Sequence, residues 1–243
     1  MVSKNQIKLI TSLQQKKYRK QHQLFLAEGV KVVQELIDAN YELQDIFTTQ
    51  DDFSRISSNK RHAVLPTDLK KISALSTPNT CLALFSIPKA VKIESTGLIL
   101  ALDSVRDPGN LGTIIRLCDW FGITTLVCSE ETVDVYNPKV VQATMGSISR
   151  VNIVYVDLEK YLLDAKLPIY GTFMDGKSIY KEKLPKEGII VMGNEANGIS
   201  NSIENIVSER ISIPRFGNLQ LTESLNVATA TAIILNEFKR IEI

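Results

Sequence analysis

The chain has 243 residues, with 28 lysines and arginines against 27 aspartates and glutamates, and 44% of its residues are hydrophobic. This length suits one large domain or two small ones, and it allows a sizeable core without disulfides. The formal charge of +1 excludes a strong overall field toward nucleic acid, the apolar content excludes a disordered chain, and the absence of any run of about 18 apolar residues excludes a membrane span.

The first third of the chain predicts a small layer of alternating helices and strands. Apolar residues at helical spacing predict a helix over residues 4–15, and the basic stretch 16–23 that follows is interpreted as a solvated turn. Further along, the pattern predicts strands at 24–29, 43–49, 62–66 and 80–87, and helices at 30–39 and 69–74. Such alternation is typical of a small α/β domain.

The rest of the chain repeats this alternation more strongly. The pattern predicts strands at 97–105, 124–129, 150–156, 167–173, 188–194 and 211–214, and helices at 110–121, 138–146 and 224–240. The strand at 97–105 is apolar almost throughout, which is typical of a central parallel strand. The last helix is apolar nearly all round, so we expect its own sheet or a partner chain to bury it.

Charge and glycine divide the chain into two parts. Residues 1–86 carry 12 basic and 8 acidic residues, whereas all the glycines except Gly29 lie at or after Gly97. Glycine allows close approach of backbone to ligand. We therefore expect a basic first domain over 1–88, a linker over 89–96, and a ligand-holding domain over 97–243.

The basic run near the N-terminus predicts contact with RNA phosphates. Residues 1–27 hold six basic residues and no acid, and an aromatic residue, Tyr18, lies within the densest part of the run. We expect the phosphate contacts to come from four side chains, those of Lys16, Lys17, Arg19 and Lys20.

The cysteines and the N-terminus bear on the compartment. Cys81, Cys118 and Cys128 form neither a metal-spaced pair nor a disulfide framework, so we expect reduced core thiols and no metal site. The first 20 residues lack the apolar block of a signal peptide. These features together favour a soluble cytoplasmic protein.

Several kinds of catalytic site are excluded from the second domain. Both histidines, His22 and His62, lie in the first domain, which excludes a Ser-His-Asp or Cys-His site in the second. Neither a GxGxxG motif after a strand nor a P-loop motif is present. The usual dinucleotide and nucleotide sites are therefore not expected.

Three segments instead place small and polar residues directly after predicted strands. They are residues 102–122, 189–200 and 211–233. Ligands of open α/β sheets bind beyond the carboxyl ends of strands, and helix N-termini there offer free N–H donors. We therefore expect these segments to form one site.

The residues in these segments resemble the three motifs of the SpoU (TrmH-type) family of SPOUT RNA methyltransferases. The matching residues are Asn110 through Arg116 in NxGxxxR, Gly193-Asn194-Glu195 with Gly198, and Ile213-Pro214 followed by Ser224-Leu225-Asn226. The N-terminal stretch is similar to the L30e-like substrate domain of many members. The resemblance covers nearly the whole chain.

This resemblance implies a fold, a cofactor and an activity. It implies a trefoil-knotted α/β domain with a parallel sheet, a homodimer through that domain, S-adenosylmethionine (SAM) as cofactor, and methylation of a ribose 2′-hydroxyl. An L30e-like domain favours rRNA, and 23S rRNA in particular, over tRNA. Residues that match the SAM-binding positions are Gly193, Ile213 and Leu225.

The polar positions around methyl transfer are matched by Asn110, Arg116, Glu195, Ser224 and Asn226. Arg116 is the residue that would clamp a phosphate or accept the proton of the hydroxyl. Because arginine is a poor base and binds phosphate well, we favour the clamp.

Two alternative functions stay open, and the sequence departs from the family motifs at three places. One alternative is a non-catalytic RNA-binding or ribosome-associated protein, and the other is an enzyme that methylates a base nitrogen. The departures are Arg215 in place of a frequent methionine, a longer loop over 217–223, and Asn197 where glycine or an acid is common.

Overall fold

The computed structural model describes residues 2–89, 93, 96–219 and 224–240. The chain forms two compact units, Met1–Ala90 with Asp134–Arg150, and Val91–Val133 with Val151–Ile243. The segment 134–150 thus belongs in space with the first unit, although it lies well inside the second part of the sequence. The predicted boundaries at 88 and 97 stay a prediction, and residues 90–92 and 94–95 of the predicted linker lie outside the described residues.

The first unit is a mixed four-stranded sheet with helices. The strand order is β1-β4-β2-β3, in which β4 is antiparallel to both neighbours and β3 is parallel to β2. Its elements are α1 (Lys4–Ser12), α2 (Lys16–His22), β1 (Leu24–Glu28), α3 (Val30–Asp38), β2 (Leu43–Thr48), β3 (Arg61–Ala63), α4 (Pro66–Ile72), β4 (Cys81–Ser86), α6 (Pro138–Thr144) and the short 3-10 helix Ser147–Ser149.

Two predictions in this unit need correction. Residues 16–22 form α2 and not a solvated turn, because lysine, arginine and glutamine favour helices and the Arg19 side chain anchors this one to the turn before it. Helix α4 begins at Pro66, three residues before its predicted start, because proline suits a first helical turn.

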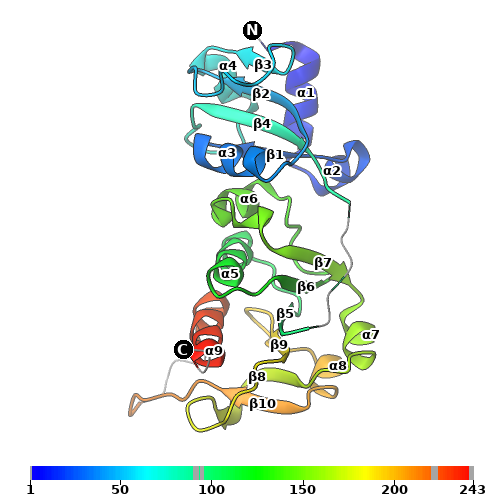
Figure 1. The fold of residues 1–243 in the computed structure, drawn as a ribbon, viewed down its shortest axis with the longest axis vertical. Helices are drawn as coiled ribbons and strands as arrows, with labels where there is room; N and C mark the ends of the chain where they lie inside the picture. Colours follow the sequence, from blue (N-terminus) through cyan, green and yellow to red (C-terminus); the bar gives the residue numbers. More distant parts are fainter. Residues whose placement is uncertain (1, 90–92, 94–95, 220–223, 241–243) are drawn as a thin grey trace. The chain divides into compact units, whose positions relative to one another are not determined.

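The second unit is built on a six-stranded sheet in which every neighbouring pair is parallel, in the order β10-β8-β9-β5-β6-β7. Helices α5 and α9 cover one face, and α7 and α8 cover the other (Figure 1). Its elements are β5 (Leu98–Leu102), α5 (Pro108–Trp120), β6 (Thr125–Ser129), β7 (Asn152–Val156), α7 (Leu158–Leu163), β8 (Ile169–Ser178), β9 (Gly188–Met192), α8 (Asn201–Glu204), β10 (Glu209–Ser212) and α9 (Val227–Arg240).

The predicted class, an α/β protein with a parallel sheet after a small α/β domain, is confirmed. Strand β5 is fully buried between β9 and β6, as its continuous apolar sequence predicts. Helix α9 begins at Val227, and the short helices α7 and α8 escaped prediction. The predicted knot depends on the chain path from Ile213 to Asn226, of which residues 220–223 lie outside the described part.

The three cysteines lie in the two cores. All are buried and free, and burial raises the pKa of the Cys81 thiol to about 12. Burial raises the pKa of Cys118 and Cys128 further still. The thiols are therefore protonated core groups, as predicted.

In the described part of the chain, no helix combines the length and the apolar character needed to cross a membrane.

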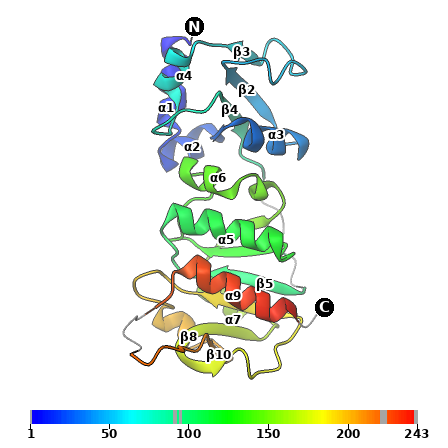
Figure 2. The ribbon, with the colours of Figure 1, turned by 90° about the vertical axis from the view of Figure 1, so that its left-hand side faces the viewer.

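Parallel pairing brings the polar strand exits to one edge of the sheet. Strands β5, β9 and β10 run in the same direction, so the residues after Leu102, Met192 and Ser212 leave the sheet on the same side. Helices α5 and α9 lie side by side over this sheet (Figure 2). The N-terminal ends of the two helices lie within two of the three polar segments.

Candidate active site

Three polar residues from the three predicted segments meet in one hydrogen-bonded cluster. Asn110 lies in the first turn of α5, Glu195 follows β9, and Asn226 directly precedes α9. The Asn110 Nδ2 donates to Glu195 Oε1 at 3.0 Å, and the Asn226 Nδ2 donates to Asn110 Oδ1 at 2.9 Å. The structure therefore joins residues that are 85 and 116 positions apart in sequence.

The Glu195 carboxylate is held in its ionised form. Its two oxygens accept hydrogen bonds from the backbone N–H groups of Arg106 and Asp107, each at 3.1 Å, besides the one from Asn110. Partial burial acts to raise the pKa of Glu195, but these hydrogen bonds outweigh it and hold the pKa below its usual range. The Glu195 carboxylate is thus negatively charged, and hydrogen bonds already occupy most of the lone pairs on its two oxygens.

Local capping fixes the two asparagines of the cluster. The Asp107 side chain accepts from the Asn110 N–H at 2.8 Å and caps α5, while Pro108 occupies the first helical turn. The Asn226 Oδ1 accepts from the N–H groups of Ala228 and Thr229 at the start of α9. The cap thus fixes the backbone of Asn110, and the bonds to Oδ1 orient the Asn226 amide so that its Nδ2 reaches Asn110.

The loop after β9 depends on a close backbone contact. A Cβ atom on Gly193 would lie 2.2 Å from the Gly198 carbonyl carbon and 2.3 Å from the Ile199 nitrogen. The backbones of Asn194 and Gly198 exchange two hydrogen bonds across this contact. Glycine at 193 is therefore required by the chain's own packing, whereas the sequence suggested closeness to a cofactor as the reason.

A cavity of about 1160 Å³ lies beside this cluster, and residues from all three predicted SAM-binding positions line it: Gly193, Ile213 and Leu225. The carboxylate-bearing Glu195 and the hydroxyl-bearing Ser224 also line it. Apolar groups, among them Met192, form part of the same wall. The predicted cofactor residues are thus brought together in one space.

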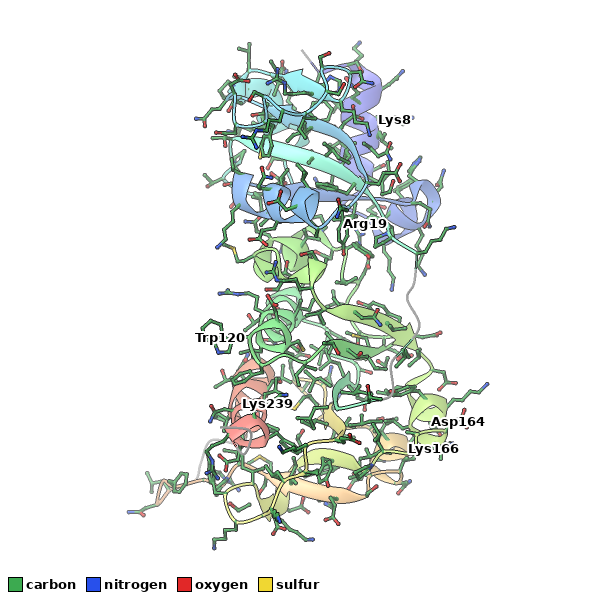
Figure 3. The ribbon with its side chains drawn as sticks, viewed as in Figure 1. Lys8, Arg19, Trp120, Asp164, Lys166 and Lys239 are labelled. Atoms are coloured by element: carbon green, nitrogen blue, oxygen red, sulfur yellow. The ribbon has the colours of Figure 1, made fainter. Side chains whose placement is uncertain are left out.

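Arg116 lies apart from this cavity. It is exposed on α5, six residues after Asn110, which is about 9 Å along the helix axis. It does not line the cavity, and it makes no hydrogen bond or ion pair with another described residue. One helical turn later, Trp120 points away from the protein with 84% of its surface exposed (Figure 3).

The basic run divides into exposed and buried members. Lys16, Lys17 and Lys20 are exposed on α2, and the Lys17 ammonium lies 4.6 Å from the centre of the Tyr18 ring. Arg19, by contrast, is only 2% exposed. The four residues therefore do not share one surface role.

The prediction that Arg19 contacts RNA does not fit its position. Its Nη2 lies 2.5 Å from Asp134 Oδ2, and its Nη1 donates to the carbonyls of Leu13 and Gln14. These contacts and the bond from its Nε to Asp134 use four of the five N–H donors of a buried guanidinium, so Arg19 does not present itself to a phosphate. Arg19 instead ties the segment that begins at Asp134 to the first unit.

Sequence reasoning missed residues that position the site. The Asp103 carboxylate accepts from the Ser200 N–H at 2.7 Å, and the Asn194 Nδ2 donates to the Ser104 carbonyl at 2.6 Å. Both contacts hold the loop after β5 against the loop after β9. The signal was present in the sequence, since Asp103, Ser104 and Asn194 closely follow buried strands.

Among the described residues, no group of three or more His, Cys, Asp or Glu side chains is placed to hold a metal ion.

Comparison with protein families matches both parts of the chain. Residues 97–236 match the model of the SpoU rRNA methylase family, and residues 4–83 match the model of the MRM3-like substrate binding domain. The first match covers more than half of the chain.

Individual relatives match over nearly the full length. The chain is 30% identical to the 23S rRNA (guanosine(2553)-2′-O)-methyltransferase RlmP of Bacillus subtilis, with 96% of each protein covered. Among solved structures, a TrmH-family protein from Porphyromonas gingivalis is 38% identical with a TM-score of 0.89 over 99% of both chains. An AdoMet-bound rRNA methyltransferase from Sinorhizobium meliloti is 27% identical with a TM-score of 0.87, over 100% of this chain and 98% of that one. With its three motifs gathered at one edge of a parallel sheet, the chain belongs to the SpoU rRNA methylase family.

Proposed function

We propose that this protein is a SAM-dependent RNA methyltransferase that transfers a methyl group to a ribose 2′-hydroxyl of 23S rRNA in the cytoplasm. The observation that carries this proposal is the hydrogen-bonded contact of Asn110, Glu195 and Asn226 beside a cavity of about 1160 Å³. The names of relatives support it, because RlmP acts on a 2′-oxygen in 23S rRNA and the Sinorhizobium meliloti protein binds AdoMet.

The cavity fits the proposed cofactor. Its volume is sufficient for a nucleoside-sized ligand, since small-molecule sites commonly span about 300–1,000 Å³. The Ile213 and Leu225 side chains offer apolar contact to an adenine ring, and Gly193 presents backbone without a side chain. When bound, SAM supplies a methyl group activated by its sulfonium charge.

The cluster is suited to orienting the ribose. The hydroxyl must lose its proton as its oxygen attacks the methyl group. Glu195 is a poor candidate for the base because its hydrogen bonds stabilise the unprotonated form, and the proton passes instead to solvent water, which reaches this exposed cluster. Glu195 instead fixes the Asn110 amide, which in turn fixes Asn226. Ser224 at the cavity wall completes the polar set proposed to contact the ribose.

For Arg116 we favour phosphate binding over proton removal. A guanidinium keeps its proton at any ordinary pH and binds phosphate through two parallel N–H groups. Its exposed place on α5, outside the cavity, suits a clamp on the RNA backbone next to the target ribose. Lysine keeps the charge but loses the two-pronged contact, so near-full turnover of an Arg116→Lys variant would exclude both roles.

We also propose a homodimer through the face formed by α5 and α9. Trp120 is 84% exposed on α5, and burial of this aromatic side chain against a partner would remove a large apolar surface from water, which supports the proposal. Sedimentation should show a dimer at micromolar concentration and a monomer for Trp120→Glu. A wild-type monomer would exclude this part of the proposal.

A non-catalytic RNA-binding protein is the second candidate. The intact cluster and cavity speak against it, because a protein that no longer transfers methyl groups has no need for either. Calorimetry with SAM separates the two candidates, since only the enzyme is expected to bind it.

The decisive experiment is transfer of labelled methyl from SAM to unmodified 23S rRNA and tRNA transcripts, followed by alkaline hydrolysis. A methylated 2′-oxygen blocks cleavage at its linkage, so we expect label in alkali-resistant dinucleotides from 23S rRNA. Label in mononucleotides would indicate base methylation instead. An absence of both label and SAM binding would favour the non-catalytic candidate.

A further inference from the structure

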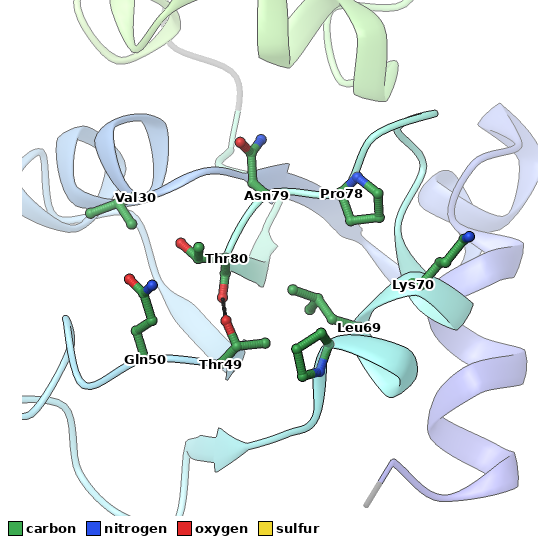
Figure 4. Close-up of a pocket in the computed structure, with 9 residues that line it drawn as sticks. Val30, Thr49, Gln50, Leu69, Lys70, Pro78, Asn79 and Thr80 are labelled. Atoms are coloured by element: carbon green, nitrogen blue, oxygen red, sulfur yellow. Dashed lines mark hydrogen bonds between the residues drawn. The ribbon is translucent and has the colours of Figure 1, made fainter.

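The first unit contains a cavity of its own, at one edge of its sheet (Figure 4). Strands β1, β2 and β3 end at this edge and β4 begins there, as the pairing of Thr48 with both Ala63 and Cys81 shows. The cavity measures about 800 Å³. It is thus large enough to admit a nucleotide-sized group.

The lining combines flat apolar surfaces with polar side chains that have spare hydrogen-bonding capacity. Pro66, Leu69 and Pro78 supply apolar contact. The amides of Gln50 and Asn79 make no side-chain hydrogen bond with another described residue. An amide both donates and accepts, which is what the edge of a nucleobase requires.

The charge of the lining suits a nucleotide. Lys70 is the only charged residue that lines the cavity within the described chain, and its ammonium forms no ion pair there. Two carboxylates are adjacent in sequence to lining residues: Asp68 is bonded to Lys71 at 2.7 Å, and Asp51 is bonded to Arg61 at 2.5 Å. A neutral polar pocket with one free cation at its rim matches a neutral base carrying one phosphate.

The cavity is held in shape by contacts that leave its polar groups free. The Thr49 hydroxyl and backbone N–H both donate to the Thr80 carbonyl and tie the ends of β2 and β4 together. Glu28 is buried at the end of β1, and its carboxylate accepts from the Ser73 hydroxyl and the Ala74 N–H, which fixes the loop that carries Asn79.

A glycine allows the Asn79 amide to take its position. Gly29 has φ of +91°, and a Cβ there would lie only 3.2 Å from the Asn79 Nδ2. The amide therefore packs against bare backbone.

We propose that this cavity receives an unpaired nucleobase of the RNA substrate, with Gln50 and Asn79 on the base edge and Lys70 on a flanking phosphate. The inference deepens the proposed function and rests on it. It draws support from the match of residues 4–83 to a substrate binding domain. Sequence-specific RNA recognition mostly targets unstacked bases, which need a pocket with amide and apolar groups of this kind.

The test compares amide variants in the full-length protein. Leucine is close in size to asparagine and glutamine but cannot form hydrogen bonds, so the Gln50→Leu/Asn79→Leu double variant removes base recognition and keeps the volume. We expect KM for 23S rRNA to rise about tenfold or more, with kcat and SAM affinity unchanged. The matched control is Asn59→Leu, an exposed amide of the same unit outside the cavity. It should leave KM unchanged.

The lysine is tested separately. Lys70→Ala should raise KM a few-fold and flatten its dependence on salt, whereas Lys8→Ala, an exposed lysine on α1 (Figure 3), should do neither. Melting temperatures verify folding of each variant. If the double variant melts early, the two single amide variants carry the test, because both positions are exposed.

Direct binding of labelled 23S rRNA, without SAM, separates this inference from the proposed function. A tenfold weaker affinity of the double variant supports the cavity whether or not methyl is transferred. An affinity and KM within twofold of wild type, or an equal loss in Asn59→Leu, overturns it. If the double variant loses affinity for assembled large subunits but not for naked rRNA, the cavity binds a ribosomal protein and not a nucleobase. That result also overturns the proposal.

Discussion

In each unit a charged side chain is held by several hydrogen bonds, but one of the two is buried and the other is exposed. In the first unit the Arg19 guanidinium is buried against Asp134 and two backbone carbonyls. In the second unit the Glu195 carboxylate is exposed at a cavity and accepts hydrogen bonds from Asn110 and two backbone N–H groups. Both charges are held by several hydrogen bonds, but Arg19 is buried and Glu195 is exposed, so only Glu195 can meet a ligand.

The difference shows why charge in a sequence is a weak guide to a binding surface. Arg19 lies among three lysines that are exposed, and nothing in the run KKYRK distinguishes it from them. A buried charge fixes the fold because removing its partner leaves an uncompensated ion, whereas an exposed one loses little when a partner is removed. Four measurements can break or sharpen this comparison.

The largest effect is expected from Arg19→Ala. It leaves Asp134 and the Leu13 and Gln14 carbonyls without their donor, so we expect the free energy of unfolding to fall by about 3–5 kcal/mol. Urea unfolding measures it. The neighbouring exposed Lys20→Ala should change it by less than about 0.5 kcal/mol. Equal effects in the two variants would show that Arg19 is not structural.

Gly193→Ala tests whether the exposed Glu195 cluster depends on the close backbone packing of the loop after β9. The new Cβ would meet the Gly198–Ile199 peptide at 2.2–2.3 Å, so the loop must shift, and we expect a loss of about 1–3 kcal/mol in stability together with weaker SAM binding. Calorimetry and urea unfolding measure the two effects. Gly217→Ala is the control for stability, because nothing other than its chain neighbours lies within 4 Å of its Cβ position; it lines the same cavity and is therefore no control for SAM binding. A Gly193→Ala variant with wild-type SAM affinity would contradict the proposed cavity.

Glu195→Gln keeps the shape of the side chain and removes the charge. Hydrogen bonds to a charged acceptor are about twice as strong as neutral ones, so Asn110 should lose its fixed orientation and kcat should fall about 10- to 100-fold with little loss of stability. The methyl-transfer assay measures kcat. Glu159→Gln on α7, across the sheet, should leave kcat unchanged. Full activity of Glu195→Gln would remove the cluster from the mechanism.

The smallest effect is expected from pH. The pKa of Glu195 in the folded protein lies below its ordinary value of 4.5, so its carboxylate stabilises the fold above that pH, and this contribution disappears as the pH falls through the folded pKa. The difference in melting temperature between wild type and Glu195→Gln should therefore be present at pH 7 and shrink below about pH 4.5. A difference in melting temperature that grows as the pH falls would mean that folding raises the pKa of Glu195 and does not lower it.

The amino-acid sequence determined the strands, the two long helices and the candidate site residues of the second unit, but not the short helices α7 and α8. Continuous apolar runs marked β5 and β9 as buried parallel strands, and polar residues directly after them marked the site. Parallel strands leave a sheet on the same side, so the three segments after them were predicted to form one site. The choice of Asn110, Glu195 and Asn226 within these segments came from the resemblance to the SpoU motifs.

Only the tertiary structure decided which charged groups are buried and which segments pack together. Residues 134–150 join the first unit, and the acceptor for Arg19 comes from 115 positions away, so no local pattern contains the information. The same holds for Arg116, whose motif suggested a place in the cluster but whose helix carries it away from the cavity. Periodicity reports on the face of one element, whereas burial depends on what the distant chain places against that face.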